Sequence, residues 1–74
     1  MTTTLETQAD TIVMLSKEIE TTETELQYCA GLIAGMAADG ETDSPIFNSQ
    51  VLRYRKLRES LRSVKAAYQE ALSD

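Results

Sequence analysis

The sequence predicts an all-α fold: an antiparallel two-helix hairpin of the coiled-coil type, assembling as a dimer that forms a four-helix bundle or as a higher oligomer. Three observations predict it. Apolar residues recur every seven positions along two long segments, which is the spacing of a coiled-coil seam. One short segment rich in Gly, Asp and Ser separates them, as a turn would. When the chain folds back there, the two seams face each other residue by residue.

The first helix is expected over residues 4–38. Thr3 and Glu6 have the spacing of a capping box, so we expect this helix to begin at Thr3 or Thr4. Gly40 can adopt the left-handed conformation that ends helices, which places the helix end at about Ala38. The seam positions of this helix are Leu5, Gln8, Ile12, Leu15, Ile19, Thr22, Leu26, Cys29, Ile33 and Met36.

The second helix is expected over residues 45–72, after a loop at 39–44, so that residues 1–74 form a single helical-hairpin domain. Asp43 or Ser44 would cap its first turn, and Pro45 suits the first helical position because its missing N–H is not needed there. Its seam positions are Phe47, Gln50, Tyr54, Leu57, Leu61, Val64, Tyr68 and Ala71. The facing pairs then include Cys29 with Tyr54, and Leu26 with Leu57.

Three seam positions are polar. Gln8, Thr22 and Gln50 stand where apolar residues are usual, and such residues lower stability but fix the register of a coiled coil. Thr22 lies near the middle, where its hydroxyl can bond the backbone carbonyl four residues before it.

Charge is divided between the two helices. Residues 1–43 hold nine acids and one base, a net charge of −8, whereas residues 44–74 hold six bases and three acids, a net charge of +3. In the expected register Arg53 lies near Glu25 or Leu32, Arg58 near Glu23, and Lys65 near Glu18 or Ser16. The cations that this pairing leaves over are Arg55, Lys56 and Arg62, and we expect them to form an interaction surface.

Apolar residues also occur outside the seam. They include Val13, Met14, Tyr28, Leu32, Val51, Leu52 and Leu72. A lone hairpin would leave them in water, and contiguous exposed apolar surface usually marks an interface. Val13 and Met14 are therefore added to the predicted interaction surface. Gly31 and Gly35, one turn apart within a helix, predict close packing of another helix, with a pocket or a bend as alternatives.

The sequence predicts no catalysis, no metal and no cofactor. The chain has no His, and Cys29 is its only Cys, so we expect this thiol to be a small buried seam residue. The most apolar run, Tyr28–Ala38, has eleven residues, whereas a membrane helix needs about 20. A single unpaired Cys and the absence of a signal peptide favour the cytoplasm.

The expected function is that of a noncatalytic, self-associating protein–protein interaction module of the accessory or inhibitory kind. The alternative is an RNA- or nucleotide-binding hairpin that uses the basic face of the second helix. The outline resembles, in fold only, the small homodimeric RNA-binding hairpin that controls plasmid copy number. Similar hairpins occur among phage and mobile-element accessory proteins, but no motif transfers from either group.

Overall fold

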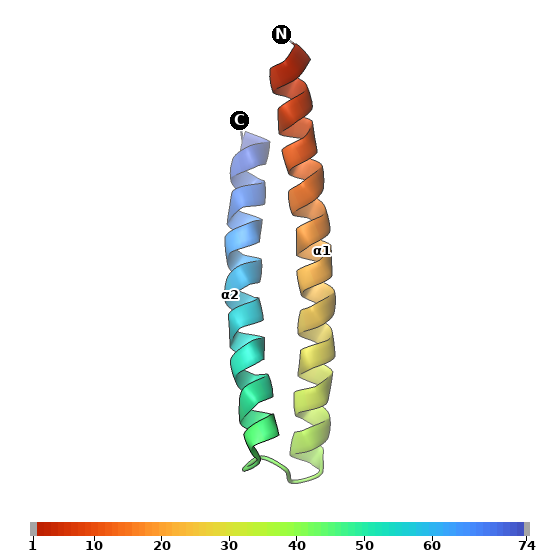
Figure 1. Ribbon diagram of the computed structural model, residues 1–74, viewed down its shortest axis with the longest axis vertical. Helices are drawn as coiled ribbons and strands as arrows, with labels where there is room; N and C mark the ends of the chain where they lie inside the picture. Colours follow the sequence, from red (N-terminus) through yellow and green to blue (C-terminus); the bar gives the residue numbers. More distant parts are fainter. Residues whose placement is uncertain (1, 74) are drawn as a thin grey trace.

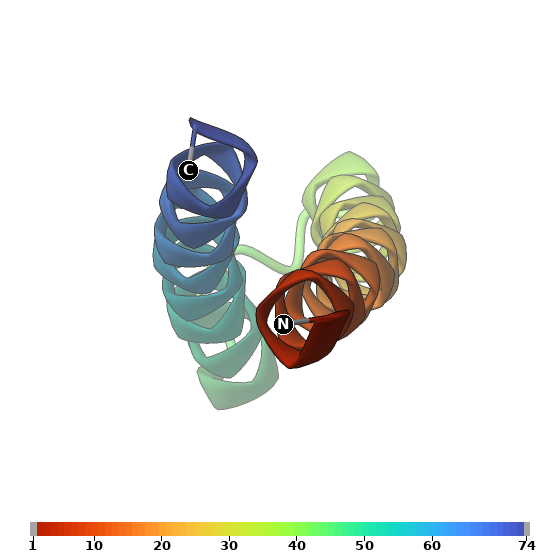
Figure 2. The same cartoon turned by 90° about the horizontal axis from the view of Figure 1, so that it is seen from above.

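Two long antiparallel helices joined by a short loop make up the chain (Figure 1). This computed structural model describes the backbone of residues 2–73 and the side chains of residues 6–73. Helix α1 spans Thr2–Ala38 and helix α2 spans Pro45–Ser73. They form a rod of 59 × 15 × 14 Å, and the view along its axis shows the helices packed side by side (Figure 2). The predicted all-helical hairpin is confirmed.

The turn forms as the sequence predicts. Gly40 has a φ of +78°, and its N–H donates to the carbonyl of Ala37 at 3.1 Å while the Glu41 N–H donates to Met36 at 2.8 Å. This pair of bonds is a Schellman motif, which satisfies the last carbonyls of α1. Ser44 caps α2, because its Oγ accepts the N–H of Phe47 at 3.0 Å.

The start of α1 differs from the prediction. The backbone is already helical at Thr2, so the helix begins before Thr3, and the predicted capping contact between Thr3 and Glu6 lies outside the described side chains. At about 1.5 Å per residue, α1 extends well past the end of α2 (Figure 1). The Gln8 amide donates to the carbonyl of Ala71 at 3.0 Å and closes this open end.

Burial follows the predicted heptads closely. Within residues 6–73, every predicted seam position is partly or fully buried, and only Ala30, Ser44 and Val51 join them. Leu5, also a predicted seam residue, lies outside the described side chains. Cys29 is the one described residue that is fully buried, with no exposed surface. The hairpin therefore has a seam but almost no core.

Cys29 marks a close approach of the two helices. Its thiol donates to the backbone carbonyl of Gln50 at 3.2 Å, with the Gln50 side-chain oxygen 3.4 Å away. The predicted register places Tyr54 opposite Cys29, and Tyr54 lies one turn beyond Gln50 in α2. The carbonyls of α2 point toward its C-terminus, which brings the Gln50 oxygen to the level of Cys29, so the predicted register agrees to within a turn.

Thr22 does not make the backbone bond that its position allows. This hydroxyl makes no hydrogen bond, whereas Thr11 and Thr24 donate to carbonyls four residues back at 2.9 and 3.0 Å. No described buried side-chain nitrogen or oxygen lacks a partner. The Thr22 hydroxyl therefore keeps contact with solvent at the edge of the seam.

Candidate interaction surface

Two ion pairs mark the two sides of the seam. Lys65 Nζ lies 3.5 Å from Glu23, and Arg53 Nη2 lies 3.9 Å from Glu25, as predicted. In two antiparallel helices, residues at a given heptad position next to the seam face residues at the same position of the other helix. Glu23 and Lys65 share one such position, and Glu25 and Arg53 share another. The two ion pairs therefore lie on opposite sides of the seam. We call these the Lys65 side and the Arg53 side. All four side chains are about half exposed, and such pairs contribute little stability.

The predicted partner of Lys65 is wrong. Glu18 lies on the Arg53 side, where it lines a depression with Lys56. Side chains of a helix lean toward its N-terminus, which carries the Lys65 ammonium back along α2 to Glu23. Arg58, predicted beside Glu23, has no ion pair among the described residues, and its guanidinium lies 5.8 Å from the centre of the Tyr54 ring instead.

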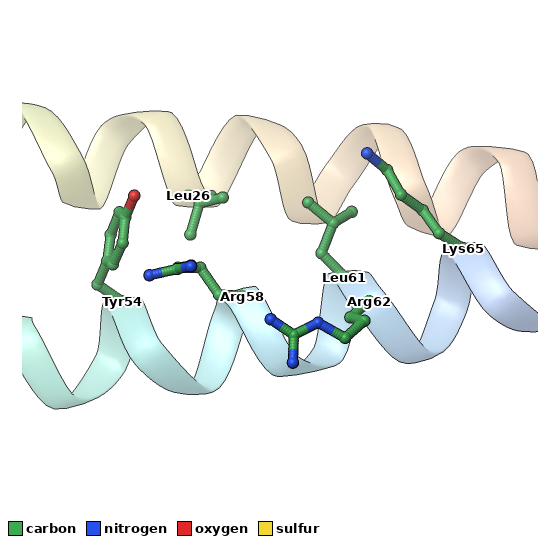
Figure 3. A pocket seen from close by; sticks show the side chains of 6 residues that line it. All are labelled: Leu26, Tyr54, Arg58, Leu61, Arg62 and Lys65. Atoms are coloured by element: carbon green, nitrogen blue, oxygen red, sulfur yellow. The ribbon is translucent and has the colours of Figure 1, made fainter.

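A groove with a cationic rim runs along the Lys65 side (Figure 3). Leu26 points from α1 toward α2, and the Arg58 guanidinium lies beside Tyr54 (Figure 3). The stretch of groove between these residues has a volume of about 310 Å³. Its lining residues are Leu26, Tyr54, Arg58, Leu61, Arg62 and Lys65. Two leucines and a ring thus provide apolar contact area, while three cations surround them.

The groove continues toward the loop as an apolar stretch. This part has a volume of about 330 Å³ and shares Tyr54 with the cationic part. Its lining residues are Ala30, Ile33, Ala34, Val51 and Tyr54. No charged residue lines it, so the Tyr54 groove, as we call both parts together, is apolar near the loop and cationic toward the middle of the hairpin.

The Arg53 side has a different character. Its depression, of about 510 Å³, mixes one cation with two acids, Lys56 with Glu18 and Glu59. Nearer the loop, Tyr28, Leu32 and Ile46 are 65%, 36% and 66% exposed. Leu32 and Ile46 stand one heptad closer to the loop than the Glu25–Arg53 pair and face each other in the same way. We call these three residues the loop-end patch.

The residues predicted to form one interaction surface are divided between the two sides. Arg62 lines the Tyr54 groove, and Val13 lies on the same side by its heptad position. Lys56 lines the Arg53-side depression, and Met14 belongs to that side. Arg55 lines neither of these depressions. Val13 and Met14 are 52% and 69% exposed, so both are open to a partner, although not to the same one.

Sequence reasoning missed the two residues at the centre of the groove, Tyr54 and Arg58. The sequence places Tyr54 in the seam and Arg58 in an ion pair, and neither belongs to the predicted interaction surface. The signal lay in the positions next to the seam: Ala30 and Val51 share a heptad position with Arg58 and Lys65. Small and apolar residues there open the seam on one side.

Gly31 and Gly35 face away from α2. A Cβ built on either residue meets no atom within 4 Å, so close packing of these glycines does not occur inside the hairpin. The prediction can apply only to a helix from another chain.

No protein-family model, curated protein or solved structure matches this chain. Neither described helix combines the length and apolar character needed to cross a membrane. Among the described residues, no three Cys, Asp or Glu side chains gather where they could hold a metal ion.

Proposed function

We propose that this chain is a noncatalytic protein–protein interaction module that assembles with copies of itself, in the manner of an accessory or inhibitory protein. One observation carries the proposal. The chain exposes 5631 Å², whereas a compact monomer of 8.2 kDa exposes about 4,500 Å². The excess of roughly 1,100 Å² is of the size that each partner of a standard protein interface covers, about 800 Å².

The distribution of apolar residues supports the same proposal. Only Cys29 is fully buried among the described residues, and a chain of this size usually needs disulfides, a metal or assembly to be stable. Among the side chains that the structure describes, seven large apolar ones remain at least one-third exposed: Val13, Met14, Tyr28, Leu32, Ile46, Leu52 and Leu72. Packing against another chain would remove them from water.

RNA or a nucleotide is the second candidate, because Arg58 and Arg62 lie in one groove with the Tyr54 ring. Aromatic rings stack on bases, and Arg binds phosphate. The acidic groups nearby weigh against it. Lys65 and Arg53 already pair with glutamates, and the chain as a whole carries a net charge of −5. These charges favour a protein partner over a polyanion.

Light scattering on the full chain between about 10 and 100 µM tests self-assembly. The expected mass is at least twice the 8.2 kDa of one chain, with helical circular dichroism at each concentration. A helical monomer throughout this range would overturn the proposal.

Titration with a short single-stranded RNA and with a nucleotide separates the two candidates. We expect no saturable binding at physiological salt. Binding that weakens steeply with salt, and that is lost when Arg55, Lys56 and Arg62 are all changed to Gln, would establish the second candidate. The same triple variant should keep the helicity of the parent, because exposed charges contribute little to folding.

A further inference from the structure

We infer that the Tyr54 groove is where a second copy of this chain docks, with both loops at the same end of the dimer. This inference rests on the proposed self-assembly and adds to it a surface, an orientation and a set of contacts. It follows from how charge and apolar area are distributed along the Lys65 side.

The middle of this side carries opposite charges on the two helices. Glu23 on α1 and Lys65 on α2 form an ion pair there, so they fix which residues lie at the same height. Glu20 lies on the same side, one turn from Glu23, and Arg62 lies one turn from Lys65 and lines the groove. Neither Glu20 nor Arg62 has an ion-pair partner among the described residues. At mid-height, therefore, α1 offers the acid Glu20 and α2 offers the base Arg62, each without an ion-pair partner in the described part of the chain. Nearer the loop, α2 also presents Arg58, whose guanidinium lies over the Tyr54 ring.

Both ends of this side are apolar on both helices. Near the loop, Ala34 of α1 and Val51 of α2 line the same stretch of groove. Near the open end, where Gln8 bonds to Ala71, the register places Val13 of α1 close in height to Leu72 of α2. These two side chains are 52% and 51% exposed. Along this side, then, both helices are apolar near the loop, both are apolar near the open end, and at mid-height α1 is acidic where α2 is basic.

Such a side fits a second copy in one orientation. A twofold axis parallel to the rod lays α1 of each copy on α2 of the other at equal height. Glu20 then meets Arg62 of the other copy, and the apolar ends meet apolar ends. A twofold axis perpendicular to the rod would lay α1 on α1 instead, which brings acids onto acids and bases onto bases. Like charges placed together are disfavoured across an interface, so the first arrangement is selected.

The Arg53 side lacks this match. There the acid Glu59 and the base Lys56 belong to the same helix and line one depression with Glu18, so α2 does not present a single sign of charge to match the acids of α1. In the dimer that we infer, this side faces outward. The loop-end patch on it, made of Tyr28, Leu32 and Ile46, stays available for a different protein.

Charge reversal tests the surface. Glu20→Lys alone and Arg62→Glu alone should each raise the dimer dissociation constant at least about tenfold, because the symmetry repeats every contact twice. The double variant Glu20→Lys/Arg62→Glu should restore the parental constant. Matched reversals on the Arg53 side, Glu18→Lys and Lys56→Glu, should leave it unchanged. Helicity of each variant is measured at the same concentrations to show that the hairpin is folded.

A spin-label distance tests the orientation. The chain Cys29→Ser/Thr42→Cys, labelled at position 42 in the loop, should give a distance within about 30 Å in the dimer, because neighbouring helices lie about 10 Å apart. A distance near the 59 Å length of the rod would overturn the orientation.

The outcomes separate the inference from the proposal beneath it. A parental chain that is monomeric overturns both. A parental dimer that ignores Glu20→Lys and Arg62→Glu overturns only the inferred surface. A dimer that instead dissociates with the Arg53-side reversals also overturns it and moves the interface to the Arg53 side. Loss in both single variants and recovery in the double variant supports it.

Discussion

The loop half and the open half of this hairpin share one seam but are secured differently. In the loop half, the Schellman turn, the Ser44 cap and the buried Cys29 thiol tie the helices together over a few turns. In the open half, one amide–carbonyl bond from Gln8 to Ala71 closes the end. The heptad pattern thus positions both halves alike. The two halves differ in the number of hydrogen bonds that join the helices or cap their ends, and we expect this difference to make the loop half harder to open.

The open half should therefore separate first. Local opening is favoured where few buried contacts and few protected hydrogen bonds resist it. The following changes compare matched residues of the two halves, beginning with the largest expected effect.

Two seam isoleucines give the most direct comparison. Ile33 lies in the loop half and Ile12 in the open half, and both are partly buried. Truncation of Ile33 to Ala should cost about 2 kcal/mol, the low end for a buried side chain, while Ile12→Ala should cost about half of that because the end frays. Urea denaturation at one fixed chain concentration measures both. Equal losses would show that the halves are equally firm.

Two glycines compare the turn with the helix. Gly40→Ala should cost about 1 kcal/mol, because a residue with a Cβ is strained at a φ of +78°. Gly35→Ala should add up to about 1 kcal/mol, because Ala favours helix and its Cβ meets open space in the hairpin. Melting temperatures decide the signs. A loss at Gly35, accompanied by a lower oligomeric mass, would instead establish the close helix packing predicted from the sequence.

Two serines compare a cap with a surface bond. Ser44→Ala removes the acceptor for the Phe47 N–H and should cost about 1 kcal/mol. Ser73, in the open half, donates only to the exposed carbonyl of Gln69 at 2.9 Å. Ser73→Ala should be neutral within about 0.5 kcal/mol. Thermal unfolding of both variants at equal concentration tests this, and similar losses would contradict it.

The smallest effects are expected at the two ion pairs. Glu25→Gln breaks the pair with Arg53, and Glu23→Gln breaks the pair with Lys65, nearer the open end. Each should cost only a few tenths of a kcal/mol at low salt, since exposed pairs are worth little, and nothing at about 1 M salt. A loss above about 1 kcal/mol at either site would mean that the pair is buried by another chain.

Much of this fold can be predicted from the sequence. The heptads identify every partly buried seam position in residues 6–73, because many repeats agree on one phase. Gly40, Ser44 and Pro45 locate the turn, since each residue is suited to one backbone position. The start of α1 is not predicted in the same way, because the backbone of α1 runs past the end of α2, which therefore does not fix where α1 begins.

The candidate surface is less predictable for a physical reason. Glu18 stands at the height of Lys65 but on the Arg53 side, and height alone does not separate the two sides. On its own side, the Lys65 side chain leans back along α2 and reaches Glu23. The prediction for Arg58 fails for the same reason, because its expected partner, Glu23, pairs with Lys65 instead. Lys56 and Arg62 are six residues apart in the sequence, and six steps of about 100° place them about 120° apart around the helix, so they line different sides.

The fully buried thiol of Cys29 has a chemical consequence. An alkylating reagent cannot reach the sulfur while the helices are closed, so its reaction rate reports how often the hairpin opens at the middle of its loop half. If assembly holds the helices closed, that rate falls as chain concentration rises. A disulfide between two copies would likewise require both hairpins to open, so a covalent dimer formed by oxidation would be a record of unfolding rather than of the native assembly.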